Sequence, residues 1–434
     1  MTIVQKLLSK ARQKNGIYLG LSLLARALNA VGMFIAIQRF APSTFGEMSF
    51  LQATAVSTVA FCSFGIELSV NALLSRKVRE SAPLGPTILA ACLLAGAGML
   101  CACIVVATLF GPQLAVVGSV GTAVRAVSLY ASFMILTSLL SAMSFAQSAS
   151  INVGIAYLLT SLVFTSFAIF AATGTSGSQL MFFANVAQII STAFMALALA
   201  RRALLRSGRD ISQKLRQTLA AARIEVKSLF VYGVKQILVV SIVTFAQWYI
   251  QRKIIHGAGG TADNAIYSVG NQIFNITTFI PSILTPLLVT RLASAGSDMS
   301  LRRQICLSSL RLYAAIAVGA CLAVFVGLTL GVPYLPRRYA DATTTGTIAS
   351  MAAAFVILKW PFSVFFLSEL KASREIISGA AGALFMIVAT SVVANLSPNQ
   401  GTVIRLLGCA LQAILLTGMF LIETRRQMTV PVRT

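Results

Sequence analysis

The chain has 434 residues, of which 57% are hydrophobic and only 10% are charged, and its mean hydropathy is +0.85. Because about a quarter of the residues in soluble domains are charged, this composition excludes an ordinary soluble protein and predicts a chain embedded in lipid. The formal net charge of +23 would suggest nucleic-acid binding in a soluble protein. Here the positions of the positive charges along the chain account for the excess, so we expect no nucleic-acid partner.

Twelve apolar stretches are long enough to cross a bilayer as helices, since one span needs about 20 residues. None of them shows the strict alternation of a transmembrane β-strand. The sequence therefore predicts an all-α, polytopic membrane protein with 12 transmembrane helices. In chain order the expected spans are 17–37, 46–70, 87–110, 123–145, 152–172, 180–200, 229–250, 265–290, 308–331, 345–368, 376–396 and 402–422.

The connections between these spans differ strongly in charge. If the N-terminus is cytoplasmic, 23 of the 34 lysines and arginines fall on the cytoplasmic side and five on the opposite side, while six lie inside or at the ends of spans. This asymmetry follows the positive-inside rule, so we expect both termini in the cytoplasm. The positive connections also predict contacts with the anionic headgroups of membrane lipids.

The longest polar insertion, residues 201–228, separates six expected spans from the other six and carries eight basic residues. Apolar residues recur within it at i, i+4, i+7 and i+11, which predicts a basic amphipathic linker lying on the cytoplasmic membrane face. A plain tether between two lobes is the alternative. We therefore expect two six-helix lobes, residues 1–200 and 229–434, on either side of this linker.

Two similar polar stretches support an internal repeat. QRFAPSTFGEMSF, residues 38–50, joins the first two spans, and QRKIIHGAGGTADNAIYSV, residues 251–269, joins the seventh and eighth. An even number of helices per half gives both halves the same orientation, as in parallel transporter repeats. The pattern predicts two like-oriented lobes around a central cavity, which is an arrangement suited to alternating access.

Charged side chains at membrane depth mark candidate binding residues, because a charge in lipid is costly. Arg26 and Lys359 lie near the middle of their spans and are our candidates for an anion site. Arg405 lies near a span end, where its guanidinium could reach the headgroups. Arg125, Lys235 and Arg311 also lie near span ends and are further site candidates. Amides on polar helix faces, which interhelical hydrogen bonds could also explain, complete the predicted lining: Asn29, Gln52, Gln247, Asn271 and Asn275.

Two acids are candidates for ion coupling, and three prolines are candidates for bending their helices. Glu67 and Glu369 are the only acids near spans, so they are the candidates for ion coupling, although either could instead pair with a lysine or arginine. The coupling ion stays open. Pro281, Pro286 and Pro361 break the hydrogen bonding of their spans and predict hinges or static kinks. The chain lacks a nucleotide-binding loop, paired catalytic groups and CxxC spacings, so we expect a transporter without cofactor or metal.

The opening of the chain resembles a known family. A basic N-terminus precedes a helix ending in QRFAPSTFGEMSF, a second helix ends in FGIELSVN, and a basic turn SRKVRE follows. This order is similar to that of Wzx-type polysaccharide flippases of the multidrug/oligosaccharidyl-lipid/polysaccharide exporter (MOP) superfamily. The resemblance is strongest over residues 15–80. It implies a MATE-like fold and the transfer of an undecaprenyl-diphosphate-linked oligosaccharide to the periplasmic leaflet of a bacterial inner membrane.

The resemblance further implies a role in O-antigen (lipopolysaccharide), capsule or exopolysaccharide assembly, with a polysaccharide polymerase and a chain-length regulator as partners. A cationic cavity with Arg or Lys would suit the diphosphate. Three alternatives remain: a multidrug or small-molecule exporter of the same fold, an unrelated twelve-helix symporter, and a membrane polysaccharide polymerase or ligase. The short external loops count against the enzyme, and a basic cavity counts against a carrier of cations.

Overall fold

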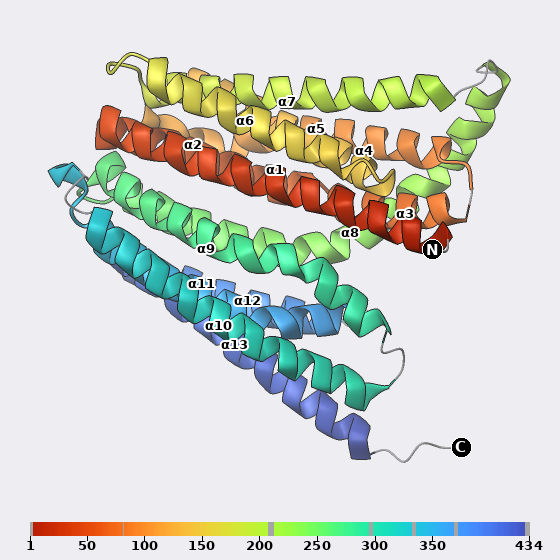
Figure 1. The fold of residues 1–434 in the computed structure, drawn as a ribbon. Helices are drawn as coiled ribbons and strands as arrows, with labels where there is room; N and C mark the ends of the chain where they lie inside the picture. The colour runs from red at the N-terminus through yellow and green to blue at the C-terminus, as the bar shows by residue number, and fades with distance from the viewer. Residues whose placement is uncertain are drawn as a thin grey trace. The chain divides into compact units, whose positions relative to one another are not determined.

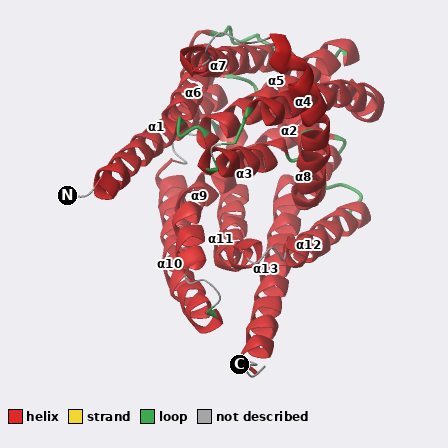
Figure 2. Ribbon diagram, turned by 90° about the vertical axis from the view of Figure 1, so that its right-hand side faces the viewer, coloured by secondary structure: helices red, strands yellow, loops and turns green. Residues whose placement is uncertain are grey.

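The computed structural model describes residues 3–80, 82–206, 212–294, 298–331, 336–368 and 372–429. Helices account for nearly all of these residues, and the described ranges contain no strand (Figure 2). Nine of the described helices are long and apolar enough to cross a membrane. They match nine of the twelve expected spans. Of the other three, 229–250 and 265–290 lie within long helices described below, and 46–70 is divided between two helices. The all-α fold class is therefore confirmed.

The chain divides into two compact units, Met1–Leu238 and Val239–Thr434. Unit 1 contains the helices from α1 to α7 and the first part of α8 (Figure 1). Its elements are α1 (Ile3–Arg39), α2 (Pro42–Cys62), α3 (Ile66–Arg79), α4 (Gly85–Val105), a π-helical turn (Val106–Phe110), a 3-10 helix (Gly111–Val117), α5 (Val120–Ala146), α6 (Ser150–Phe170) and α7 (Gly177–Arg206).

Unit 2 contains the rest of α8 (Ser212–Ile255) and five further long helices. These are α9 (Gly260–Ser294), α10 (Met299–Gly331), α11 (Ala342–Ser368), α12 (Ala372–Val392) and α13 (Pro398–Thr429), with a 3-10 turn at Arg337–Tyr339. The amphipathic segment expected inside the linker is thus the beginning of a long helix. Residues 207–211 lie outside the described residues.

The two repeated polar stretches occupy corresponding turns. The first lies where α1 ends at Arg39 and α2 begins at Pro42, and the second lies where α8 ends at Ile255 and α9 begins at Gly260. Pro42 is the first residue of α2, and the preceding Ala41 is extended, which is the conformation that a residue before proline prefers. Gly260 has φ +57°, which only glycine adopts at little cost. The expected relation between the two halves as parallel repeats stays a prediction.

Helices pack closely within each unit. In unit 1, α1 runs along α6, and α5 packs against α2, α3, α4 and α7. In unit 2, α11 packs against α9, α10 and α13. The core of unit 2 is rich in aromatic rings: Phe420 is fully buried, and its ring centroid lies 4.8 Å from that of Phe362 and 5.0 Å from that of Phe365. Each unit thus builds its own interior.

One expected span is broken. Residues 46–70 were predicted as a continuous helix, but α2 ends at Cys62 and α3 begins at Ile66. Phe64 has φ +49° and Gly65 has φ +64°, so the chain passes through the left-handed region at both residues. That conformation costs a non-glycine residue about 1–2 kcal/mol, and the surrounding packing must supply this energy. In the sequence, Gly65 indicates such a break, because a glycine inside an apolar run can end a helix.

Two glycines from other helices fit against this break. A Cβ atom added to Gly98 of α4 would lie 2.4 Å from the Cys62 carbonyl oxygen, and one added to Gly233 of α8 would lie 2.0 Å from the Phe64 carbonyl oxygen. Neither position can hold a side chain without movement of the backbone. In lipid, the backbone of a broken helix has to be enclosed by protein or water. Gly98 and Gly233 let two neighbouring helices enclose it.

Candidate functional site

The interior of unit 2 holds a buried arginine. Arg405, in the third turn of α13, is only 2% exposed. Its Nη1 donates a hydrogen bond of 2.6 Å to Asn271 Oδ1 on α9, and its guanidinium carbon lies 3.7 Å from the centroid of the Phe274 ring. The expectation that Arg405 snorkels to the headgroups is therefore wrong. Its side chain lies on the face of α13 that packs inward, so it points into the unit.

A lysine lies on the neighbouring helix. Lys359 of α11 donates a hydrogen bond of 2.8 Å from its Nζ to Gln412 Oε1 of α13. Both cations also act electrostatically on the Cys409 thiol, which lies between Arg405 and Gln412 in α13. The structure therefore brings the predicted residues Lys359 and Asn271 into one interior region, together with Arg405 and Gln412, which the prediction did not include.

These two cations have an unusual set of partners. Among the described residues, Lys359 bonds to the Gln412 amide and Arg405 to the Asn271 amide, and the buried Tyr267 hydroxyl also lies beside Arg405. No carboxylate of the described residues forms an ion pair with either cation. Arg405 Nε and Gln412 Nε2 are buried and have no hydrogen-bond partner in the described part of the chain. A buried donor without a partner costs about 1–3 kcal/mol. The region thus holds two positive charges and two buried donors that the described residues leave without a partner.

Unit 1 has a different polar group. Arg26 of α1 and Glu67, in the first turn of α3, both act electrostatically on the hydroxyls of Tyr18 and Tyr157. Glu67 lies beside Ser138, and Tyr157 lies beside Ser141, both on α5. The predicted site residue Arg26 and the predicted coupling residue Glu67 therefore lie in one cluster, drawn from α1, α3, α5 and α6. Both side chains are exposed in the structure.

The remaining predicted residues are spread over both units. Asn29, Gln52 and Gln247 are half-buried, whereas Asn275 is exposed although the residue directly before it, Phe274, is buried. Arg125 and Arg311 are exposed; both lie near the start of an expected span, although Arg311 lies well inside α10. None of these residues makes a described contact with Arg405 or Lys359. The side chain of Lys235 and the whole of Glu369 lie outside the described residues.

The predicted hinge prolines lie inside helices. Pro361 interrupts α11 two residues after Lys359, and its carbonyl oxygen accepts a hydrogen bond of 3.5 Å from the Cys306 thiol. Pro281 lies within α9, and its carbonyl oxygen accepts one of 3.5 Å from the Tyr313 hydroxyl. The side chain of Pro286 lies outside the described residues. Proline placement is thus as expected, and bending at these positions stays a prediction.

No protein-family model matches the sequence, and no curated protein matches it. Solved structures do share its fold. An inward-facing multidrug resistance MATE family transporter of the MOP superfamily superimposes with a TM-score of 0.74 at 12% identity, covering 96% of this chain and 100% of that chain. An outward-facing structure of such a transporter gives 0.64 at 14% identity, with 97% of both chains covered.

A third solved structure is a MOP superfamily transporter from Pyrococcus furiosus, for which reversed polarity of the binding pocket suggests a different function. It gives a TM-score of 0.68 at 12% identity and covers 97% of both chains. The chain therefore has the fold of the MATE transporters over nearly its whole length. Together with the nine apolar helices, this fold describes a multi-pass membrane protein.

The sequence does contain a pattern that indicates the buried residues of α13. On α13, Thr402, Arg405, Cys409 and Gln412 recur at i, i+3, i+7 and i+10, and this stripe continues into the buried Leu416 and Phe420. A polar stripe that runs into an apolar one on the same face indicates burial. Tyr18, Tyr157 and Ser138 left no comparable pattern, because tyrosines and serines are common on all faces of membrane helices.

Proposed function

We propose that this protein is a flippase that moves an undecaprenyl-diphosphate-linked oligosaccharide from the cytoplasmic to the periplasmic leaflet of a bacterial inner membrane by alternating access. The observation that carries the proposal is the pair Arg405 and Lys359, two cations inside unit 2 whose described hydrogen bonds go to amides. A diphosphate is the ligand chemistry that complements such a region, because guanidinium and ammonium groups form charge-assisted hydrogen bonds with phosphate oxygens.

The fold supports the transport mechanism of this proposal. The MATE fold has been solved in inward-facing and outward-facing conformations, and a member of the same superfamily has a pocket of reversed polarity. The chain's own resemblance to Wzx-type flippases over residues 15–80 supports the oligosaccharide-lipid substrate. The positive-inside distribution of its basic residues supports cytoplasmic termini. A polysaccharide polymerase and a chain-length regulator are the partners that such a pathway supplies.

Glu67 is our candidate for energy coupling. It is an acid in the first turn of α3, directly after the Phe64-Gly65 break, and it shares a cluster with Arg26 and two tyrosines. Protonation of its carboxyl group would remove a negative charge from the cluster that also contains Arg26. The Glu67→Gln variant is therefore expected to retain substrate binding but to lose the response of transport to an imposed pH gradient. An unchanged response would remove Glu67 from the coupling step.

The substrate is tested by reconstitution. The purified protein is placed in liposomes with a fluorescent undecaprenyl-diphosphate oligosaccharide, and its transfer between leaflets is followed with a membrane-impermeant quencher. Lys359→Gln and Arg405→Gln are each expected to slow transfer at least ten-fold, because a hydrogen bond to a charged group contributes about 1.5–3 kcal/mol. Arg76→Gln is the matched control, since Arg76 is an exposed cation that pairs with Glu80 on the same helix.

A multidrug exporter of the same fold is the second candidate, and the multidrug transporters among the matched structures favour it. The two functions respond differently to the same variants. Loss of a positive charge inside unit 2 should slow a flippase of diphosphates but should not slow export of cationic dyes. Wild-type export of a cationic dye would establish the exporter instead, if oligosaccharide transfer is absent in the wild-type protein or is unaltered in the Lys359→Gln and Arg405→Gln variants.

A further inference from the structure

The first part of α8 runs across one end of the helices of unit 1, as both views show (Figures 1 and 2). This is the end at which α1 begins and α3 runs into α4. Three residues of this segment pack inward: Ala222 and Leu229 are each 1% exposed, and Gly233 is buried against the break between α2 and α3. They recur at i, i+7 and i+11, so one face of the helix is docked on the unit.

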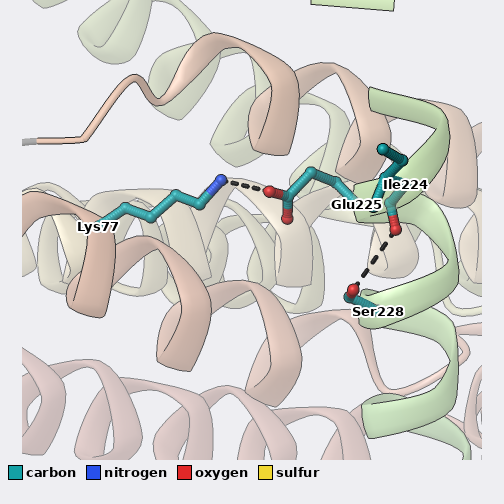
Figure 3. Close-up of polar contacts among 4 residues, drawn as sticks. All are labelled: Lys77, Ile224, Glu225 and Ser228. Atoms are coloured by element: carbon teal, nitrogen blue, oxygen red, sulfur yellow. Dashed lines mark hydrogen bonds and ion pairs between the residues drawn. The ribbon is translucent and has the colours of Figure 1, made fainter. Parts of the chain in front are cut away.

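An ion pair holds the same face. Lys77 of α3 donates a hydrogen bond from its Nζ to Glu225 Oε1 of α8 (Figure 3), and the two side chains are 18% and 19% exposed. The rings of Phe64 and Phe230 add a contact with centroids 5.6 Å apart. Glu225 is the only acid between residues 212 and 250. Its pairing with Lys77 directs the one negative charge of this segment toward α3.

The opposite face combines positive charge with apolar surface. Arg223 and Lys227 are exposed and lie one turn apart. Beside them Ile224 is 73% exposed and Val231 is 51% exposed, and these two side chains recur at i and i+7. A helix with basic residues flanking an apolar strip is suited to the boundary between headgroups and acyl chains, where its axis lies parallel to the membrane plane. An orientation across the ends of membrane-spanning helices meets that requirement.

We propose that this face, formed by Arg223, Ile224, Lys227 and Val231 and here termed the α8 surface strip, binds the headgroups of anionic phospholipids in the adjacent leaflet. The two cations contact lipid phosphates, and the two apolar side chains insert below them. Because Lys77 neutralises Glu225, no acid of the segment opposes the attraction. The proposal does not depend on which molecule the protein transports.

Hydrogen exchange of the full-length protein in lipid nanodiscs tests this proposal. One preparation contains phosphatidylcholine alone, and the other contains phosphatidylcholine mixed with phosphatidylglycerol. The amides of residues 221–232 should exchange more slowly in the anionic discs, by up to about thirty-fold, because each basic side chain near an anionic surface contributes about 1 kcal/mol. High salt should reduce the difference, since the charges are screened.

Variants then assign the effect to the α8 surface strip. The double variant Arg223→Gln/Lys227→Gln should lose most of the difference between the two lipid compositions. Arg76→Gln/Arg201→Gln is the matched control, because it removes two exposed charges of unit 1 outside the strip and should keep the difference. Inorganic phosphate added to phosphatidylcholine discs should not slow exchange, which separates a lipid surface from a free anion.

Three results would overturn the proposal. Equal exchange in both lipid compositions would show that the strip does not recognise anionic lipid. An undiminished lipid effect in Arg223→Gln/Lys227→Gln would place the recognition elsewhere. Protection that requires two copies of the protein in one disc, whatever the lipid, would assign the strip to self-association instead.

Discussion

Adding one methyl group at Gly98 should destabilise the protein, whereas adding one at Gly96, two residues earlier on α4, should not. The Cβ atom of Gly98→Ala would lie 2.4 Å from the Cys62 carbonyl oxygen, and real Cβ atoms essentially never approach closer than 3.0 Å. Nothing lies within 4 Å of the corresponding atom at Gly96. The two substitutions therefore change the same residue type in the same helix and differ only in the packing that they meet.

The expected magnitudes follow from two opposing effects. Alanine is favoured over glycine inside a helix by about 1 kcal/mol, and Gly96→Ala should gain up to this amount. Gly98→Ala gains the same free energy from helix propensity but forces α4 away from the end of α2. Overpacking of this kind costs about 1–3 kcal/mol. The nearest obstacle is a backbone atom, which cannot rotate away as the end of a flexible side chain would.

Thermal unfolding of the purified variants in one detergent measures the difference. We expect Gly98→Ala to unfold at a lower temperature than the wild-type protein and Gly96→Ala to unfold at the same or a higher temperature. Gly233→Ala should behave like Gly98→Ala, because its added atom meets the Phe64 carbonyl oxygen. A Gly98→Ala variant as stable as Gly96→Ala would refute the view that α4 is packed against the break in this way.

Three further predictions concern stability and packing. Burial and the neighbouring Asp341 carboxylate raise the pKa of Asp263, so the ionised form of this side chain opposes folding. Asp263→Asn should therefore raise the unfolding temperature at pH 7. The gain should shrink as the pH falls through the raised pKa toward the value of about 3.9 for an unperturbed aspartate. The pKa of Asp298 shifts in the opposite direction, because hydrogen bonds from Ser300 and Leu301 lower it. Asp298→Ala should therefore destabilise the protein at pH 7, and a difference in stability that did not shrink as the pH falls through this lowered pKa would contradict the explanation. Phe420→Ala should cost about 3–5 kcal/mol in chemical unfolding, whereas Val392→Ala, at a residue that is 80% exposed, should leave the midpoint nearly unchanged. Equal effects of these two substitutions would argue against the aromatic core of unit 2.

Hydropathy alone was enough to locate the helices. A membrane span has to satisfy its backbone internally and therefore needs about 20 apolar residues in one run, so its position is visible without knowledge of the neighbouring helices. The turns could be located for a related reason: Pro42 and Gly260 restrict or free the backbone locally, whatever packs around them. Properties of this kind depend on a few adjacent residues, and the sequence displays them directly.

The break at Phe64-Gly65 depends on distant residues as well. Glycine at position 65 permits a left-handed conformation, but a non-glycine residue such as Phe64 enters it only when the surrounding structure compensates the cost. That compensation comes from close packing against Gly98, 34 positions further along the chain, and against Gly233, in another helix of unit 1. A single sequence does not show that these two glycines face the break, so the helix was predicted to be continuous.

The position of Arg405 was missed for an electrostatic reason. Arg405 lies near the start of the expected span 402–422, and exposure to headgroups at a span end is the lowest-energy solution for an isolated helix. Within unit 2, the Phe274 ring and the Asn271 amide offer the guanidinium a partial replacement for water, and a stacked cation–π contact contributes about 2 kcal/mol when desolvated. Neither partner carries a negative charge, so the charge of Arg405 is solvated but not neutralised. An arginine held in this way keeps its attraction for an anion, which is why we regard Arg405, together with Lys359, as a residue on which the proposed diphosphate binding depends.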